Sequence, residues 1–180
     1  LNMEVEKGEV VGLLGHNGAG KSTAFSMIVG LVRPDNGRIY FQGQDISRFP
    51  IYKRARMGMG YLSQEPSVFQ RLSVEENVLA ILEVRGNHRD KRRRAAQLLD
   101  DFGLTHLARK KAYTLSGGEK RRLELARALA STPNMILLDE PFSGIDPIAI
   151  SELQAMVMGL KRMGIGVLLT DHNVRDALSI

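Results

Sequence analysis

The hydrophobic residues of this chain fall into short continuous runs that alternate with helical patterns. Apolar runs at residues 9–14, 135–138 and 167–170 are typical of buried parallel strands. Apolar residues recur at helical spacing over residues 22–31 and 123–130. Strands that alternate with helices in this way predict an α/β fold with a parallel sheet.

The first part of the chain carries a second kind of β pattern. Residues 1–5 alternate apolar and polar like a strand, and Lys7-Gly8 turns the chain into the run at 9–14. This pattern predicts a hairpin. Further short strands are expected near residues 38–42 and 59–63. We therefore expect an antiparallel β part beside the parallel sheet.

Residues from about 73 to 114 are expected to be mostly helical. Ser73 followed by Glu76 fits a capping box at the start of the first helix. The apolar residues of that helix share one side: Val74, Val78, Ile81 and Leu82. The sequence therefore predicts an inserted helical subdomain.

Composition and charge exclude few classes. The chain has 180 residues, 43% of them hydrophobic, which is ordinary for a soluble fold, and it has no cysteine for disulfides or thiolate chemistry. No apolar run reaches the roughly 18 residues of a membrane helix. The net charge is +5, and the densest basic run lies at residues 89–94. A solvated helix start is favoured there over an anionic lipid contact, and the lack of interleaved aromatics argues against nucleic acid.

A glycine-rich segment directly follows the first buried run. It fits the phosphate-loop pattern G-x-x-x-x-G-K-[ST], and Thr23 follows it: Gly15-His16-Asn17-Gly18-Ala19-Gly20-Lys21-Ser22. The glycines let backbone N–H groups turn inward around phosphates, Lys21 adds a positive charge, and the Ser22 hydroxyl can bind Mg²⁺. The strand before this segment and the helix after it favour a phosphate-binding loop over a plain glycine turn.

A second glycine motif, Leu115-Ser116-Gly117-Gly118-Glu119, precedes a helical pattern. Ser116 suits a helix N-cap, and the two glycines leave the first amides of the helix uncovered. Alone, this would be an ordinary capped helix. Paired with the phosphate loop, it resembles the signature sequence of the ATP-binding cassette (ABC) ATPases. In that family the signature binds the γ-phosphate of ATP held by the phosphate loop of the other subunit.

The run at 135–138 ends in two acids, Asp139 and Glu140. Consecutive strand residues point to opposite sides, so the two carboxylates are expected to have different tasks. Asp139 resembles the Walker B acid that holds Mg²⁺ in P-loop enzymes. By the same resemblance, Glu140 polarises the attacking water. Two solvated acids at a strand end are the plainer alternative.

Gln64 and His172 complete the catalytic set that the resemblance implies. Gln64 follows the strand-like run at 59–63 and is similar to the Q-loop glutamine, which reaches Mg²⁺ or the water. His172 follows the run at 167–170 and is similar to the switch histidine, which contacts the γ-phosphate. Either residue alone would be ordinary polar surface. Their place in the order of motifs favours the functional roles.

The resemblance implies a P-loop ABC ATPase fold, with residues 1–180 as one nucleotide-binding domain that lacks sequence at both ends. The missing N-terminal part would include the aromatic residue that stacks on adenine. Two copies would bind head to tail and enclose two ATP molecules, each between Lys21 of one chain and Ser116 of the other. Residues 143–146 resemble the D-loop of that interface, although Asp146-Pro147 also fit a plain helix start.

Longer strings at residues 69–77, 139–148 and 170–175 resemble the ATPases of bacterial lipopolysaccharide exporters. ATPases of branched-chain amino acid importers are the nearest alternative, but they commonly carry Glu where this chain has Asp171. The resemblance implies a peripheral subunit on the cytoplasmic face of the inner membrane, with transmembrane permease subunits as partners and no nucleic acid. Those subunits are expected to dock near Phe69, Arg71 and Leu72. The alternative is that Phe69 and Leu72 are core residues of the helical subdomain.

Other classes fit less well. ABC ATPases of chromosome maintenance carry long coiled coils, and no heptad pattern is sustained here. ABC translation factors carry two cassettes, and this chain has one. A P-loop kinase would lack the motif at 115–119. A binding module without hydrolysis would not need both Glu140 and His172.

Overall fold

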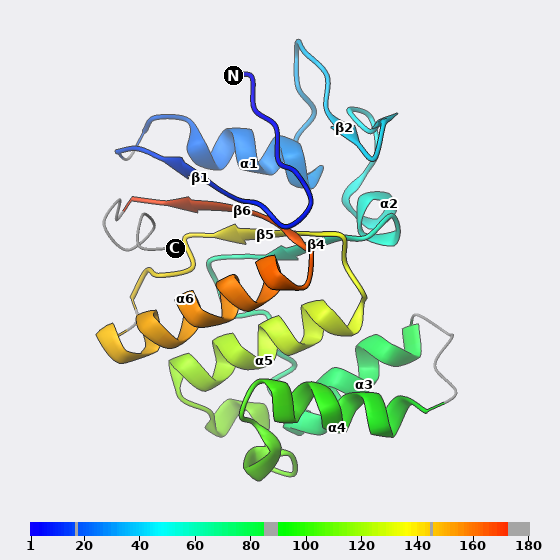
Figure 1. Cartoon of the computed structure of the whole chain (residues 1–180), viewed down its shortest axis with the longest axis vertical. Helices are drawn as coiled ribbons and strands as arrows, with labels where there is room; N and C mark the ends of the chain where they lie inside the picture. The colour runs from blue at the N-terminus through cyan, green and yellow to red at the C-terminus, as the bar shows by residue number, and fades with distance from the viewer. Residues whose placement is uncertain (17, 85–89, 145, 173–180) are drawn as a thin grey trace.

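The computed structural model describes residues 1–16, 18–84, 90–144 and 146–172 (Figure 1). The strands are β1 (Val10–Leu14), β2 (Tyr40–Phe41), β3 (Gln44–Asp45), β4 (Met59–Leu62), β5 (Met135–Asp139) and β6 (Gly166–Asp171). The helices are α1 (Lys21–Val29), α2 (Ile51–Arg56), α3 (Val74–Val84), α4 (Lys91–Asp101), α5 (Gly117–Ala130) and α6 (Pro147–Arg162). Two short 3₁₀ turns, Thr105–Leu107 and Ala112–Thr114, lie between α4 and α5.

Four parallel strands form the central sheet in the order β1-β6-β5-β4. β2 and β3 pair separately as a small antiparallel sheet. Helix α1 covers one face of the central sheet, and α5 and α6 cover the other (Figure 1). Helices α3 and α4 pack on α5, on its side away from the sheet (Figure 1). The predicted α/β fold with an antiparallel part is confirmed.

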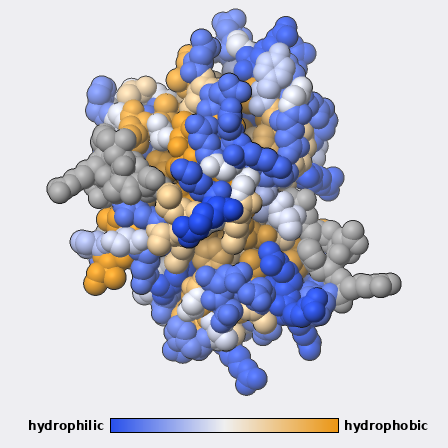
Figure 2. All heavy atoms as spheres, in the orientation of Figure 1, coloured by the Kyte–Doolittle hydropathy of each residue, from blue (hydrophilic) through white to orange (hydrophobic). Residues whose placement is uncertain are grey.

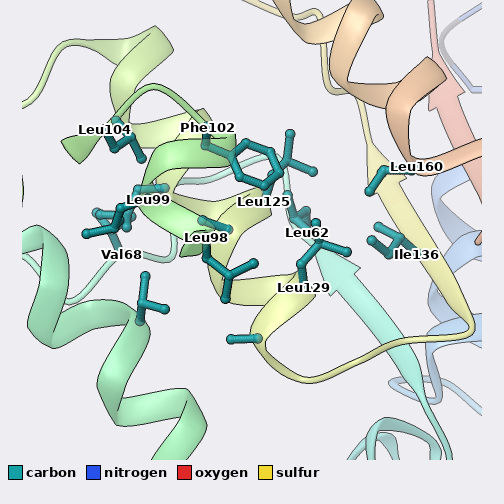
Figure 3. Packing of buried hydrophobic residues seen from close by; sticks show 14 of the residues in the cluster. Leu62, Val68, Leu98, Leu99, Phe102, Leu104, Leu125, Leu129, Ile136 and Leu160 are labelled. Atoms are coloured by element: carbon teal, nitrogen blue, oxygen red, sulfur yellow. The ribbon is translucent and has the colours of Figure 1, made fainter. Parts of the chain in front are cut away.

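The hydrophobic core has two parts because strand residues alternate between faces. On β5, Leu137 packs toward α1 with Phe25 and Val29. Its neighbours Ile136 and Leu138 face the other way, into a larger cluster that extends through α5 to α3 and α4. Figure 3 shows this larger cluster, with side chains from β4 and β5 on one side and from α4 on the other. Helix α5, which begins at the second glycine motif, therefore shares one apolar core with Leu62 and Val68, which lie on either side of Gln64.

One strand prediction was wrong, and a second strand is shorter than predicted. Residues 1–6 form no strand, because β1 pairs in parallel with β6 and the alternating side chains before it are not buried on one face. Leu1 is 84% exposed and Met3 is 37% exposed. The strand expected at 38–42 is only Tyr40–Phe41, because Gln42 takes a positive φ of 51° and turns the chain into β3.

The helical predictions fared better. Ser73 and Glu76 form the predicted capping box of α3, through Ser73 N to Glu76 Oε2 at 2.6 Å and Glu76 N to Ser73 Oγ at 3.1 Å. The basic run begins α4, where Arg92 and Arg93 are exposed, as expected of a solvated helix start; Arg89 lies outside the described residues. In the described part of the chain, no helix is long and apolar enough to cross a membrane. The boundaries of the helical subdomain at about 73–114 stay a prediction.

Candidate functional site

The register of the sheet brings the predicted site residues to one edge. Leu14 of β1 is level with Asp171 of β6, and Asp139 of β5 is level with Thr170. Because all four strands are parallel, their carboxyl ends share one edge of the sheet, where ligands bind in open α/β folds. The phosphate loop, Gln64, Glu140 and His172 each follow the end of a different strand.

The phosphate loop lies between β1 and α1. Gly18 and Gly20 have φ of +84° and +87°, a conformation that favours glycine, and a β-carbon at either would meet nothing within 4 Å. The Lys21 side chain is 7% exposed, and its Nζ donates to the carbonyls of Gly15 at 2.5 Å and His16 at 3.1 Å. The cation is thus held over the loop.

Helix α1 begins without a side-chain cap and has no acid in its first turn. Its first amides therefore remain available, and the positive end of the helix dipole adds to Lys21. Ser22 and Thr23 are exposed beside them. Such a cradle suits a polyphosphate. Asn17, also predicted to bind it, lies outside the described residues.

Two of the predicted catalytic residues, Gln64 and His172, lie beside Glu140. It follows β5 with a positive φ of 43°, and its N–H donates to the Thr170 carbonyl at 3.0 Å. Its Oε2 accepts a hydrogen bond from Gln64 Nε2 at 3.1 Å and lies 3.7 Å from His172 Nδ1. The structure therefore brings Gln64, Glu140 and His172 together, although they are far apart in the sequence.

Asp139 occupies the last position of β5 and is held differently from Glu140. Its Oδ1 accepts a hydrogen bond from the buried Thr170 hydroxyl at 2.7 Å. Burial, and then the nearby Asp139 charge, raise the pKa of the Tyr61 hydroxyl. Asp139 and Glu140 therefore have different side-chain partners, and their different tasks stay a prediction. Hydroxyl and carboxylate oxygens, which Ser22 and Asp139 offer, are the donors that Mg²⁺ prefers.

The second glycine motif caps α5 as predicted. Ser116 Oγ accepts from Glu119 N at 3.3 Å, and Glu119 Oε2 accepts from Ser116 N at 2.7 Å. The hydrogen bond from the Ser116 amide lowers the pKa of the Glu119 carboxyl. Ser116 and Gly117 are exposed. The carboxylate of Glu119 is thus occupied within its own helix cap, while the first turn faces outward.

The structure does not join this motif to the phosphate loop. Figure 1 shows the start of α6 between the strand ends and the start of α5. Asp146 caps α6 as predicted, through Ile148 N and Ala149 N at 3.0 Å each. Ile145, in the predicted D-loop, lies outside the described residues.

The residues expected to meet a permease lie in the connection from β4 to α3. Phe69 is 44% exposed, so it is not the core residue of the alternative interpretation. Arg71 is exposed and Leu72 is half-buried. The Arg127 guanidinium lies over the Phe69 ring, 4.3 Å from its centre.

Sequence reasoning missed the buried polar residues behind Gln64. Arg121 and Glu124 are charged, yet they are only 9% and 3% exposed. The apolar residues of α5 surround Glu124, and an apolar pattern on nearly all sides of a helix indicates burial. That signal could have identified Glu124. Asn77, fully buried on α3, had no comparable signal.

Comparison with known proteins gives a family. The ABC transporter family matches residues 1–143. The lipopolysaccharide export system ATP-binding protein LptB of Acidithiobacillus ferridurans is 55% identical over the whole chain, which spans 75% of that protein. LptB of Escherichia coli is 49% identical, with 76% of its length covered. A probable ABC transporter ATP-binding protein of Azorhizobium caulinodans is 54% identical, and the chain spans 64% of it.

Solved structures agree with the sequence relatives. The ADP conformation of MJ1267, an ATP-binding cassette of an ABC transporter, superposes with a TM-score of 0.88 at 32% identity, over 97% of this chain and 74% of that one. A dimeric post-hydrolysis state of the cassette MJ0796, bound to ADP and Pi, gives a TM-score of 0.84 at 28% identity, over 98% of this chain and 80% of that one. The chain therefore belongs to the ABC transporter family, as its ATP-binding, ATP-hydrolysing cassette.

Proposed function

We propose that this cassette hydrolyses ATP to power lipopolysaccharide export from the cytoplasmic face of the bacterial inner membrane. The observation that carries the proposal is the identity of 49–55%, along the whole chain, to proteins named for lipopolysaccharide export. The convergence of Gln64 and His172 on the Glu140 carboxylate supports hydrolysis by this chain. The cassette would act as a homodimer, peripheral to the membrane.

The triphosphate of ATP would bind the loop from Gly15 to Thr23. Lys21 would donate to the phosphates in place of the loop carbonyls that it contacts here, and the first amides of α1 would add neutral donors. Ser22, Asp139 and Gln64 would hold Mg²⁺. When bound, Mg²⁺ neutralises charge on the β- and γ-phosphates. Thr170 fixes Asp139 for this task by donating to its Oδ1.

Glu140 would accept the proton of the attacking water. A general base must lie within hydrogen-bond reach of that water and be held in place. Gln64 holds the carboxylate from one side, and the partly exposed His172 ring lies near the same oxygen. His172 would then contact the γ-phosphate. Catalysis of phosphoryl transfer by positioning and charge stabilisation requires little more of the protein.

A second copy would complete the site. Ser116 and Gly117 face outward, so they would contact the nucleotide of the partner rather than that of their own chain. Ile148, in the first turn of α6, is 75% exposed, and Figure 2 shows hydrophobic atoms at the left edge, over the start of this helix. An exposed apolar residue next to Asp146 supports an interface there. Both surfaces would be covered in a head-to-tail dimer.

Permease subunits would dock on the connection from β4 to α3. The Phe69 ring, with Arg127 over it, offers an aromatic anchor, and Arg71 and Leu72 add a cation and an apolar wall. Aromatic and arginine side chains dominate binding energy at small interfaces.

Mixing two inactive variants tests whether each site is shared between chains. Lys21→Ala disables the phosphate loop. Gly117→Asp places a negative charge on the signature, and a β-carbon at Gly117 meets nothing within 4 Å, so the chain still folds. In a mixed dimer one site carries both lesions and the other is intact. We expect turnover of about a quarter of the parental rate, because half of the dimers are mixed and each has one intact site.

The control mixture pairs Lys21→Ala with a chain that carries both substitutions, and it should stay inactive because every site then lacks its lysine. If the first mixture recovers no ATP turnover, or if a monomer hydrolyses ATP at the parental rate, the proposal that two chains share each site is wrong. The export role is tested separately in cells depleted of their own export ATPase. Expression of the intact protein should restore lipopolysaccharide to the cell surface; cells that stay depleted of it contradict the export role.

A further inference from the structure

The loop at residues 63–69 connects the catalytic Gln64 to the exposed Phe69 ring. Side chains from α3 and α5 hold its backbone at both ends. The contacts are Arg121 Nη1 to Ser63 O at 3.0 Å, Arg127 Nη1 to Ser67 O at 2.6 Å, Ser67 N to Glu124 Oε1, and Asn77 to both backbone groups of Phe69. Three of these side chains, Asn77, Arg121 and Glu124, are buried, although connecting loops usually lie on the surface.

Glu124 is at the centre of these contacts. One carboxylate oxygen accepts from the Ser67 amide and lies 3.2 Å from the Ser67 hydroxyl. The other accepts from Arg121 at 3.0 Å, and Arg121 in turn donates to the carbonyl of Ser63, next to Gln64. Taking two charges out of water is costly, so a buried ion pair is weak support for stability by itself. The contacts of the Arg121–Glu124 pair with Ser63 and Ser67 indicate instead that the pair fixes the conformation of the loop.

The other end of the loop is fixed as firmly. Asn77 Oδ1 accepts from Phe69 N at 2.8 Å, and its Nδ2 donates to Phe69 O at 3.0 Å and to Ser73 O at 2.9 Å. Between the two ends, Val68 is buried in the apolar cluster with Leu98 and Leu99 (Figure 3). Gln64 and Phe69 therefore belong to one segment with little freedom to move independently.

We propose that Glu124, together with Arg121, is a positioning residue for Gln64. It holds the loop so that the Gln64 carboxamide rests on the Glu140 carboxylate, at 3.1 Å. The inference rests on the proposed function, in which Gln64 and Glu140 act in hydrolysis. Since α5 begins with the signature at Ser116, a displacement of α5 at the partner's nucleotide would be passed through Glu124 to Gln64 of its own chain. The two sites of a dimer are coupled by this route.

A double-mutant cycle with Gln64 separates positioning from general stability. Glu124→Gln keeps an acceptor for Ser67 and the volume of the side chain, but it removes the charge that fixes Arg121. We expect kcat to fall about tenfold, within the range that small misplacement of catalytic groups produces, while KM for ATP is unchanged because the phosphate loop is untouched. In a Gln64→Ala background, Glu124→Gln should change kcat less than about twofold.

Glu152→Gln is the matched control. Glu152 also forms an ion pair with an arginine of α5, Arg122, on a different part of the helix from the contacts of Glu124. It should leave kcat at the parental value. A Glu124→Gln effect that is equally large with and without Gln64 overturns the positioning role. If Gln64→Ala alone turns over ATP at the parental rate, the proposed role of Gln64 is what fails.

Hydrogen exchange gives a second readout that does not depend on activity. Arg121→Met with Glu124→Met removes the contacts of this pair with Ser63 and Ser67 without leaving one charge unpaired, a change that buried pairs often tolerate. Amides in a peptide covering residues 63–69 should exchange at least about tenfold faster, while those of β5 and β6 keep their protection. Unchanged exchange in the loop overturns the inference, since the loop is then held by other contacts.

Discussion

Arg54 allows a quantitative test of how the phosphate-loop helix is held. Its guanidinium is 1% exposed and donates to the carbonyls of Met27 and Ile28 at 2.6 Å, Phe49 at 2.8 Å and Ser47 at 3.3 Å. Met27 and Ile28 lie in the last turn of α1, where carbonyls have no partners within the helix. Arg54 thus caps the end of α1 opposite the phosphate loop, with a cation at the negative end of the helix dipole.

Replacing Arg54 by methionine has two opposing effects. The variant no longer buries a charge, whose burial here lowers the pKa of the guanidinium, and apolar replacements of buried charges are often tolerated. Three close carbonyls, however, remain inside the fold without a donor, at about 1–3 kcal/mol each when no water reaches them. The second effect is larger, so we expect the free energy of unfolding to fall by about 2–4 kcal/mol. That is a large part of the 5–15 kcal/mol of a typical domain.

Urea unfolding followed by circular dichroism measures this loss, with the slope m as a check on two-state behaviour. Arg56→Met is the matched control, since Arg56 is on the same helix but exposed, and it should change the free energy by no more than about 0.5 kcal/mol. ATP at about 100 times its Kd should add about 2.7 kcal/mol to parent and variant alike, because Arg54 does not contact the phosphate loop. Equal stability of the Arg54 and Arg56 variants would refute the capping role.

Two further predictions concern the site and its partner. Glu140→Gln should bind ATP and accumulate as an ATP-bound dimer in size-exclusion chromatography. Its turnover should be reduced by about 10²–10⁴, as expected for loss of a general base. Turnover within about threefold of the parent would show that Glu140 is not the base. Phe69→Ala should keep the ATPase activity of the isolated dimer but lose co-purification with the membrane subunits. Tyr52→Ala is the control, because it removes another exposed aromatic ring with an arginine over it, and this variant should co-purify with the membrane subunits normally. Normal co-purification of Phe69→Ala would show that the Phe69 ring is not the anchor.

The features that sequence could predict are those whose cause is local. The buried strands β5 and β6 follow from continuous apolar runs, and the caps of α3, α5 and α6 follow from polar residues within three positions of one another. The order of the motifs, by resemblance to the ABC ATPases, was enough to group Gln64, Glu140 and His172 as one catalytic set. Their meeting at a single carboxylate oxygen required the structure.

The features that sequence could not predict depend on distant partners. Ser67 and Glu124 are 57 residues apart. The apolar neighbours of Glu124 on α5 indicate that it is buried, but nothing local to the helix shows that its partner is the loop at 63–69. Residues 1–5 have the alternation of a strand, but a strand forms only with a partner at its edge, and β1 takes its partner from β6. Arg54 likewise caps a helix 26 residues before it.

Several buried polar side chains of this cassette hold the helix end, the carboxylate and the loop that surround the site. Arg54 closes the helix behind the phosphate loop, Thr170 fixes Asp139, and Glu124 holds the loop beside Gln64. Each forms hydrogen bonds with polar groups that the regular hydrogen bonds of helices and sheets leave without partners. An apolar side chain could fill the same volume but could not fix the direction of a loop. Burying these polar groups therefore costs desolvation energy but places the catalytic residues accurately. We expect substitutions of these buried polar side chains to lower turnover or stability without altering the layers of the fold.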